Sequence, residues 1–165
     1  MAGPTLPEEL LLAGHPADRP FGGHGGVLAI RVAGAALGEL VLTDRLESAE
    51  PTGHPLLDAM RADRSGSDAE WVHRWAARAY AHTRDALVAQ GALRPERRRR
   101  LWLRTDVTRL PEGDPGRAAL IERLREPEGR RDRLLAALLH ALRGTGAPDD
   151  WIIETVRRAT RISVD

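Results

Sequence analysis

Apolar residues recur at helical spacing through most of the chain, and this pattern predicts a mainly α fold. The clearest case begins at Ser67 and ends near Gly91. Ser67 with Glu70 makes a capping box, and glycine suits a helix end. The apolar stripe of this helix consists of Trp71, Trp75, Ala79, Thr83 and Leu87. Tryptophans four residues apart are more typical of core packing than of a stacking platform.

The most apolar segment, residues 27–42, predicts a buried central helix. Its sequence VLAIRVAGAALGELVL is interrupted by charge only at Arg31 and Glu39. The small residues in its middle allow neighbouring helices to approach closely. An arginine inside such a helix is costly to bury unpaired, so we expect Arg31 to face a pocket or to pair with a carboxylate. Glu39 bound to an arginine would be a structural residue.

Cap and turn signals predict five shorter helices. Thr5 with Glu8 makes a second capping box, and Asp114 suits the N-cap position before a proline. The expected helices are residues 5–13, 55–62, 114–126, 130–143 and a last one starting at 148–149. The inward-facing residues expected in the last helix are Trp151, Ile152, Val156 and Ala159.

The arginine-rich middle of the chain departs from helical spacing and predicts a β-hairpin. Alternation of apolar and polar residues gives strands at about 99–104 and 107–110, with the turn at Thr105–Asp106. Together the segments predict one compact, mainly helical domain over residues 1–165. It is built around a central apolar helix and carries one β-hairpin.

Composition narrows the functional classes. All 25 basic residues are arginine, against 24 acidic residues, and there is no cysteine. The chain therefore has no disulfide framework and no thiolate chemistry. It also lacks a stretch of about 20 apolar residues that could span a bilayer. We expect a cytoplasmic protein with at most peripheral membrane contact. The exclusive use of arginine fits either a GC-rich genome or bidentate phosphate binding.

Five segments in a fixed order carry a family resemblance. They are LPEELLL at 6–12, GELVLTDRL at 38–46, PTGHPLLDAM at 51–60, DALVAQGALRPERRRRLWL at 85–103 and RDRLLAALLHAL at 131–142. These segments resemble the Golgi phosphoprotein 3 family, especially its shorter bacterial members. They match its opening helix, the end of its central helix, a turn, a helix with the hairpin, and a late core helix.

The resemblance implies a peripheral membrane adaptor with an arginine-lined pocket on one face. In eukaryotic members this face recognises phosphatidylinositol 4-phosphate at the Golgi, and the domain links the membrane to glycosyltransferase tails and other proteins. The hairpin of the family is implicated in self-association. For this chain the resemblance implies an acidic phospholipid surface as partner, an unidentified protein partner, and a homo-oligomer formed through the hairpin.

The resemblance implies a headgroup site at His24, Arg31, Arg74 and Arg78. His24 stands near the place of the family's pocket tryptophan. Arg31 lies two residues before Ala33, where the family has an arginine, and Arg74 and Arg78 lie close to its arginine pair. Arginine can bind phosphate through paired charge-assisted hydrogen bonds, and a protonated histidine adds a donor. The alternative is that arginines on the exposed face of a helix are simply solvated.

Four consecutive arginines form a candidate basic patch. Arg97, Arg98, Arg99 and Arg100 could contact acidic lipid headgroups, where each cation contributes about 1 kcal/mol. They could also bind nucleic acid, which we regard as the weaker alternative. Strand alternation would place only half of them on one face, and charges on an exposed strand also deter edge pairing.

Catalytic and metal signals are missing from the sequence. The six histidines show no metal-ligand spacing, and the hydroxyl residues form no nucleophile–base set. We therefore expect no metal, no cofactor and no enzymatic activity. A small-molecule-binding accessory protein or an enzyme on the same scaffold stays open as an alternative.

Overall fold

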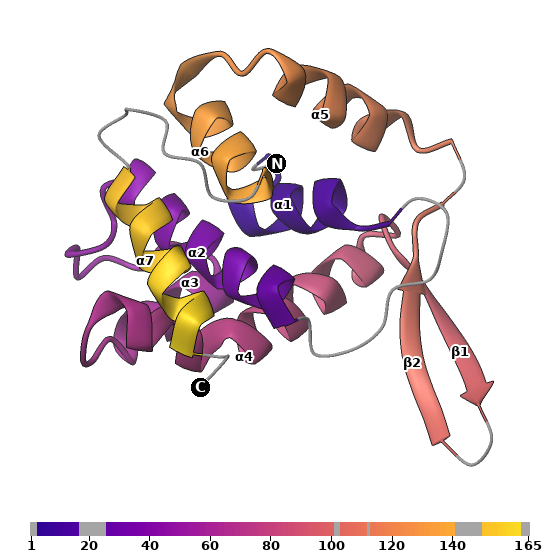
Figure 1. Cartoon of the computed structure of the whole chain (residues 1–165), viewed down its shortest axis with the longest axis horizontal. Helices are drawn as coiled ribbons and strands as arrows, with labels where there is room; N and C mark the ends of the chain where they lie inside the picture. The colour runs from indigo at the N-terminus through magenta and orange to yellow at the C-terminus, as the bar shows by residue number, and fades with distance from the viewer. Residues whose placement is uncertain (1–2, 17–25, 101–102, 112, 141–149, 163–165) are drawn as a thin grey trace.

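The computed structural model describes residues 3–16, 26–100, 103–111, 113–140 and 150–162, with the backbone alone for 97–100 and 103–106. These residues form seven helices and one antiparallel hairpin, which confirms the predicted mainly α fold (Figure 1). The elements are α1 (Leu6–Gly14), α2 (Gly26–Leu42), α3 (Pro55–Ala62), α4 (Asp68–Ala89), β1 (Arg94–Arg100), β2 (Leu103–Arg109), α5 (Pro115–Arg125), α6 (Gly129–Leu139) and α7 (Asp150–Ile162).

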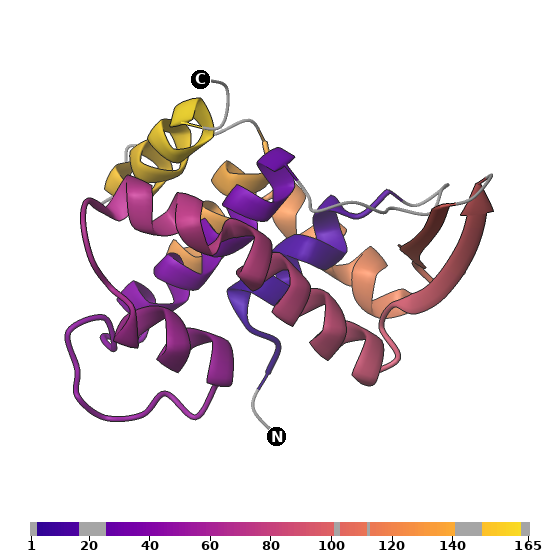
Figure 2. The same cartoon turned by 90° about the horizontal axis from the view of Figure 1, so that it is seen from below.

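Helix α2 is the centre of the core, as its apolar sequence predicts. It contacts α1, α3, α4, α6 and α7 (Figures 1 and 2). Two glycines let its neighbours approach the backbone closely. A β-carbon at Gly34 would overlap Val156 of α7, and one at Gly38 would lie 2.7 Å from Leu134 Cδ2 of α6. The small residues of α2 are therefore required by packing.

Both predicted capping boxes are present. The Glu8 carboxylate accepts a hydrogen bond from Thr5 N–H at 2.7 Å, at the start of α1. At the start of α4, Glu70 accepts from Ser67 N–H at 3.0 Å, and Ser67 Oγ accepts from Glu70 N–H at 3.3 Å. These bonds satisfy backbone donors that the first turn of a helix leaves unpaired.

The apolar stripe of α4 is buried, as predicted. Trp71 is fully buried and its Nε1 donates to Met60 O at 3.0 Å. Trp75 is nearly buried and its Nε1 donates to Asp63 Oδ2 at 2.9 Å. The two rings therefore attach α4 to α3 and the turn after it, which confirms core packing as their role.

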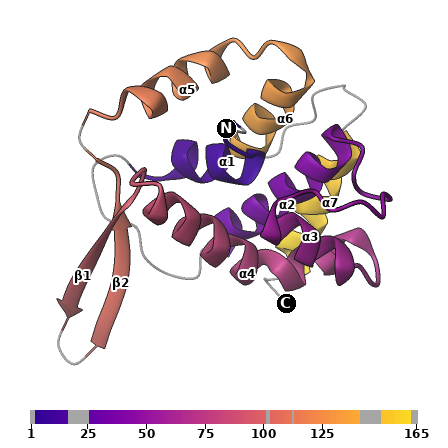
Figure 3. The same ribbon diagram turned by 180° about the vertical axis from the view of Figure 1, so that it is seen from behind.

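The hairpin projects from the helices at the C-terminal end of α4 (Figures 1 and 3). Its strands pair antiparallel, with Arg100 opposite Leu103 at one end. Thr105 and Asp106 lie inside β2, so the predicted turn at these residues is wrong. A two-residue hairpin turn needs left-handed backbone, which a β-branched threonine disfavours. In the strand, Asp106 instead stands opposite Arg97.

The last two helices differ from the prediction in detail. Helix α6 ends at Leu139 because His140 leaves helical backbone, with φ −93 and ψ 58. In α7, Ile152 and Val156 are buried, but Trp151 is 39% exposed and its predicted inward position is wrong. Ile153 takes its place in the core, since it lies on the same side of the helix as Ile152 and Val156. Residues 141–149 lie outside the described part of the chain.

Candidate functional site

The structure places the three described residues of the predicted headgroup site on two helices, α2 and α4. His24 lies outside the described residues. Arg31 extends from α2 to the end of α6, whereas Arg74 and Arg78 lie on the exposed side of α4. Among the described residues, no hydrogen bond, ion pair or shared cavity wall joins Arg31 to either arginine of α4.

The two arginines of α4 make local contacts and keep exposed nitrogen atoms. Arg74 Nη2 donates to Ser65 O at 2.8 Å and to Ser65 Oγ at 2.9 Å, which fastens the turn before α4. The Arg78 guanidinium lies 5.5 Å from the ring centre of Trp75. Neither arginine has a carboxylate within ion-pair distance in the described part of the chain. Both can therefore offer charge to an external anion.

Arg31 is half-buried and has a single described hydrogen-bond partner. Its Nη1 donates to Leu139 O at 3.0 Å, a carbonyl in the last turn of α6, where intrahelical donors are lacking. Its Nε is buried and has no partner among the described residues. Burial lowers the pKa of Arg31, and no carboxylate in the described part of the chain offsets that effect. The guanidinium edge formed by Nε and Nη2 is the edge that can bind an oxyanion in a bidentate manner.

Arg31 lines a cavity of about 480 Å³. A position facing a pocket is one of the two outcomes predicted for it from the sequence. The cavity lies between the end of α1, the first half of α2, α5 and the end of α6. The described residues of its wall are Ala13, Gly14, Leu28, Arg31, Ile121, Leu124, Arg125, Leu139 and His140. We call it the Arg31 cavity. Its described wall combines nitrogen donors with apolar side chains and includes no carboxylate.

Two polar residues of the Arg31 cavity were not predicted. Arg125 ends α5 and His140 follows α6, and both are largely exposed. Arg125 Nη1 lies 2.9 Å from the exposed carboxylate of Glu122. No sequence pattern marks these two residues, because only the packing of α5 and α6 against α1 and α2 brings them near Arg31.

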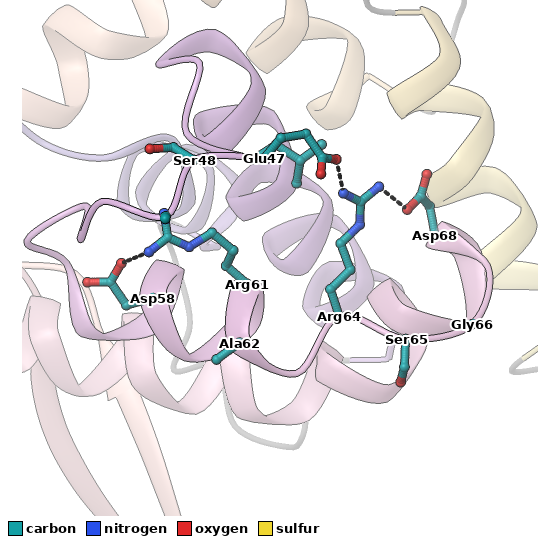
Figure 4. A pocket seen from close by; sticks show the side chains of 11 residues that line it. Glu47, Ser48, Asp58, Arg61, Ala62, Arg64, Ser65, Gly66 and Asp68 are labelled. Carbon is teal, nitrogen blue, oxygen red and sulfur yellow. Dashed lines mark hydrogen bonds and ion pairs between the residues drawn. The ribbon is translucent and has the colours of Figure 1, made fainter.

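A larger cavity of about 780 Å³ beside α3 has the opposite electrostatic character. Figure 4 shows Arg61 turned towards Asp58, at 3.2 Å, and Arg64 held between Glu47 and Asp68. The described wall thus holds three carboxylates and two arginines. Because both arginines are already paired, this cavity is a poor site for an anion.

A cluster of ion pairs around two buried glutamates joins α1, α2, α5 and α6. Glu39 accepts from Leu6 N–H at 2.6 Å, and both of its oxygens lie 3.0 Å from Arg131 Nη1. Arg131 also pairs with Glu9 at 3.0 Å, and Arg123 pairs with Glu9 at 2.6 Å. Burial alone would lower the pKa of Arg131, but the two glutamates outweigh it and raise that pKa. Glu39 is therefore structural, bound to an arginine other than Arg31.

His15 is a buried histidine at the junction of α1 and the hairpin. Its Nδ1 donates to Pro16 O at 2.8 Å, and its Nε2 lies 3.1 Å from Thr108 Oγ1 of β2. Burial lowers the pKa of His15, and the nearby charge of Arg117 acts in the same direction. The neutral ring therefore belongs to the packing of this junction.

The described residues include neither a metal-binding cluster nor a membrane-spanning helix. No group of three or more histidine, aspartate or glutamate side chains in the described part is arranged to hold a metal ion. None of the helices that the structure describes is long and apolar enough to cross a bilayer.

These features define a mainly helical domain with a small-residue central helix, a projecting hairpin and two arginines, Arg31 and Arg78, that have no carboxylate partner in the described part of the chain. The family model described as Golgi phosphoprotein 3 (GPP34) matches residues 6–164. The chain therefore belongs to the Golgi phosphoprotein 3 family, and the predicted resemblance is confirmed. No curated protein matches the chain.

Proposed function

We propose that this protein is a peripheral adaptor that binds an acidic phospholipid headgroup at a membrane surface. Family membership supports the class of function. The observation that carries the proposal for this chain is the pair Arg74 and Arg78, one turn apart on the exposed side of α4. No described carboxylate lies within ion-pair distance of either arginine, although Arg74 interacts electrostatically with the exposed Glu70 one turn earlier on α4.

Guanidinium groups suit this contact. They bind phosphate oxygens through paired, charge-assisted hydrogen bonds and stay charged at any physiological pH. Each basic residue near an anionic leaflet contributes about 1 kcal/mol, so the pair contributes roughly 2 kcal/mol, a factor of about 30 in affinity. A phosphoinositide such as phosphatidylinositol 4-phosphate, with several negative charges on one headgroup, is the first ligand to test.

The hairpin supplies a second contact in this proposal. The four arginines of the candidate basic patch, Arg97 to Arg100, lie in β1. In this proposal they add cations that can approach a leaflet. The projection of the hairpin away from the helices also makes it the element through which we propose self-association (Figure 3).

The proposed role is non-enzymatic. The buried carboxylates Glu9 and Glu39 could serve as acid–base groups, but both are bound by Arg131. A carboxylate held in this way is already supplied with hydrogen-bond donors. A cytoplasmic protein that docks on a membrane and on a protein partner needs no catalytic group.

Vesicle sedimentation tests the membrane contact. The full chain is spun with neutral phosphatidylcholine vesicles, and with vesicles that also contain phosphatidylserine or phosphatidylinositol 4-phosphate. We expect binding to the anionic vesicles alone, weakened about tenfold or more by Arg74→Ala with Arg78→Ala, and weakened by salt. The charge-matched control is Arg84→Ala with Arg158→Ala, two arginines that pair with neighbouring carboxylates.

Two results would contradict the proposal. One is that the wild-type chain stays in the supernatant with every anionic vesicle. The other is that the control pair weakens binding as much as the α4 pair, since binding would then follow net charge and not these two positions.

A further inference from the structure

We infer that the Arg31 cavity is a binding site for an amphipathic anion, a molecule with one acidic head and one aliphatic chain. The site is separate from the membrane contact proposed on α4 and does not depend on it. Fatty acids and single-chain phospholipids share this chemistry.

The Arg31 guanidinium is the group that would bind the acidic head of the ligand. Its Nη1 is engaged with Leu139 O, which fixes the orientation of the guanidinium plane. The buried Nε has no partner among the described residues, and with Nη2 it forms an edge that can donate to two oxygens of a carboxylate or phosphate. A buried donor without a partner is unfavourable, so an oxyanion bound there would remove that penalty.

The charge of the Arg31 cavity selects for an anion. Its described wall carries no carboxylate, and of its two arginines Arg125 pairs with Glu122 while Arg31 has no carboxylate partner among the described residues. In the other cavities of the described part, Arg61, Arg64 and Arg131 are each paired with one or more carboxylates. Arg31 differs from these arginines because the fold gives it a cavity and no counter-charge.

The remaining wall selects for an aliphatic chain. Leu28, Ile121, Leu124 and Leu139 provide apolar surface next to the guanidinium. The cavity volume of about 480 Å³ lies in the range of roughly 300–1,000 Å³ that holds small organic ligands. An inorganic anion would satisfy Arg31 and leave this apolar surface in contact with water, so the wall favours a ligand that covers it.

Titration calorimetry of the full chain tests this inference with four ligands below their micelle concentrations. Decanoate and decyl phosphate carry the acidic head and the chain, decanol carries only the chain, and inorganic phosphate carries only the charge. We expect decanoate or decyl phosphate to bind at least about tenfold more tightly than decanol and than inorganic phosphate. The tighter of the two anions identifies a fatty acid or a single-chain phospholipid as the natural class.

Variants locate the binding. Arg31→Gln is expected to weaken the preferred anion by about tenfold to a hundredfold, the range for lost hydrogen bonds to a charged group. Arg31→Lys keeps the charge without the two-donor edge and is expected to fall between wild type and Arg31→Gln. Arg158→Gln, an exposed arginine of α7, is the matched control and should bind like wild type. Ile121→Trp fills the apolar side, leaves Arg31 intact and should also weaken binding.

Circular dichroism first establishes that each variant is folded, and Ile121→Trp keeps the test decisive if Arg31→Gln does not fold. The inference is overturned if decanol binds as tightly as the anions, or if no ligand binds the wild-type chain. It is also overturned if the folded variants at positions 31 and 121 bind like wild type. None of these results bears on vesicle binding through α4, so the two proposals can fail separately.

Discussion

Two half-buried arginines at opposite ends of the contact between α2 and α6 have opposite environments. Arg131 of α6 reaches Glu39 near the end of α2 and also pairs with Glu9 of α1. Arg31, in the first half of α2, reaches the end of α6 and meets a carbonyl and a cavity. The pKa of Arg131 is raised by its glutamates, whereas burial lowers the pKa of Arg31.

The comparison shows that burial alone does not identify a functional arginine. Arg131 is enclosed by the groups that neutralise it, so its charge is used within the fold. Arg31 lacks such groups among the described residues, so its charge is available to a ligand. The same side chain can therefore stabilise a structure or bind a ligand, depending on the counter-charges that the neighbouring helices supply.

The largest effect that tests this comparison is the loss of Arg131. Arg131→Ala leaves the buried Glu39 without its cation and Glu9 with Arg123 alone, and we expect the free energy of unfolding to fall by about 3 kcal/mol. Arg31→Ala removes one hydrogen bond and should lower it by less than about 1 kcal/mol. Urea denaturation of both variants measures the difference, and equal losses would contradict the assignment.

The second largest effect is expected when a glycine of α2 is replaced by alanine, which adds a methyl group. Gly34→Ala would place a β-carbon against the branched side chain of Val156, and we expect a loss of about 2 kcal/mol in unfolding free energy. Gly38→Ala overlaps the flexible tip of Leu134 and makes an ordinary contact with Leu6, so it should lose about 1 kcal/mol. Thermal denaturation compares the two, and a larger loss at position 38 would mean that α7 is packed less tightly against α2 than described.

Much of the fold follows from local sequence signals. The boxes at Thr5 and Ser67, and the buried stripe of α4, depend on residues within one or two turns of each other. The hairpin register was not predictable from alternation alone, because polar and apolar residues alternate only weakly in this arginine-rich segment. The predicted inward position of Trp151 is also wrong, because the buried side of a short helix is set by the helices that cover it.

Only one residue of the candidate site could be predicted from the sequence, because it is a charged residue within an apolar segment. Arg31 attracts attention as a lone cation in an apolar helix. Arg131 stands in an ordinary charged run, and its bond to Glu39 joins residues 92 positions apart. Arg125 and His140 likewise reach the Arg31 cavity through tertiary packing. Local patterns carry no information on such contacts.

A smaller effect is expected at the junction of α1 with the hairpin. The pKa of His15 is lowered in the folded state by burial, so the unfolded chain binds a proton more readily. The stabilisation is fully present above about pH 6.5 and is lost as the pH falls through the folded-state pKa.

Melting temperatures of wild type and His15→Gln, measured from pH 8 to pH 5, test this effect. We expect the wild-type value to fall with pH more steeply than that of the variant. The exposed His82→Gln is the matched control and should follow wild type. Parallel curves for wild type and His15→Gln would show that His15 does not supply the pH dependence.

The most direct test of the contrast between the two arginines is the melting temperature of wild type and Arg31→Gln, each with and without decanoate. We predict that Arg31→Gln melts within about 3 °C of wild type, because Arg31 contributes little to folding. Decanoate at about 100 times its wild-type dissociation constant should raise the wild-type value by roughly 5–10 °C and that of the variant by at most about half as much. A variant that melts far below wild type, or one that decanoate stabilises as much as wild type, would contradict the account.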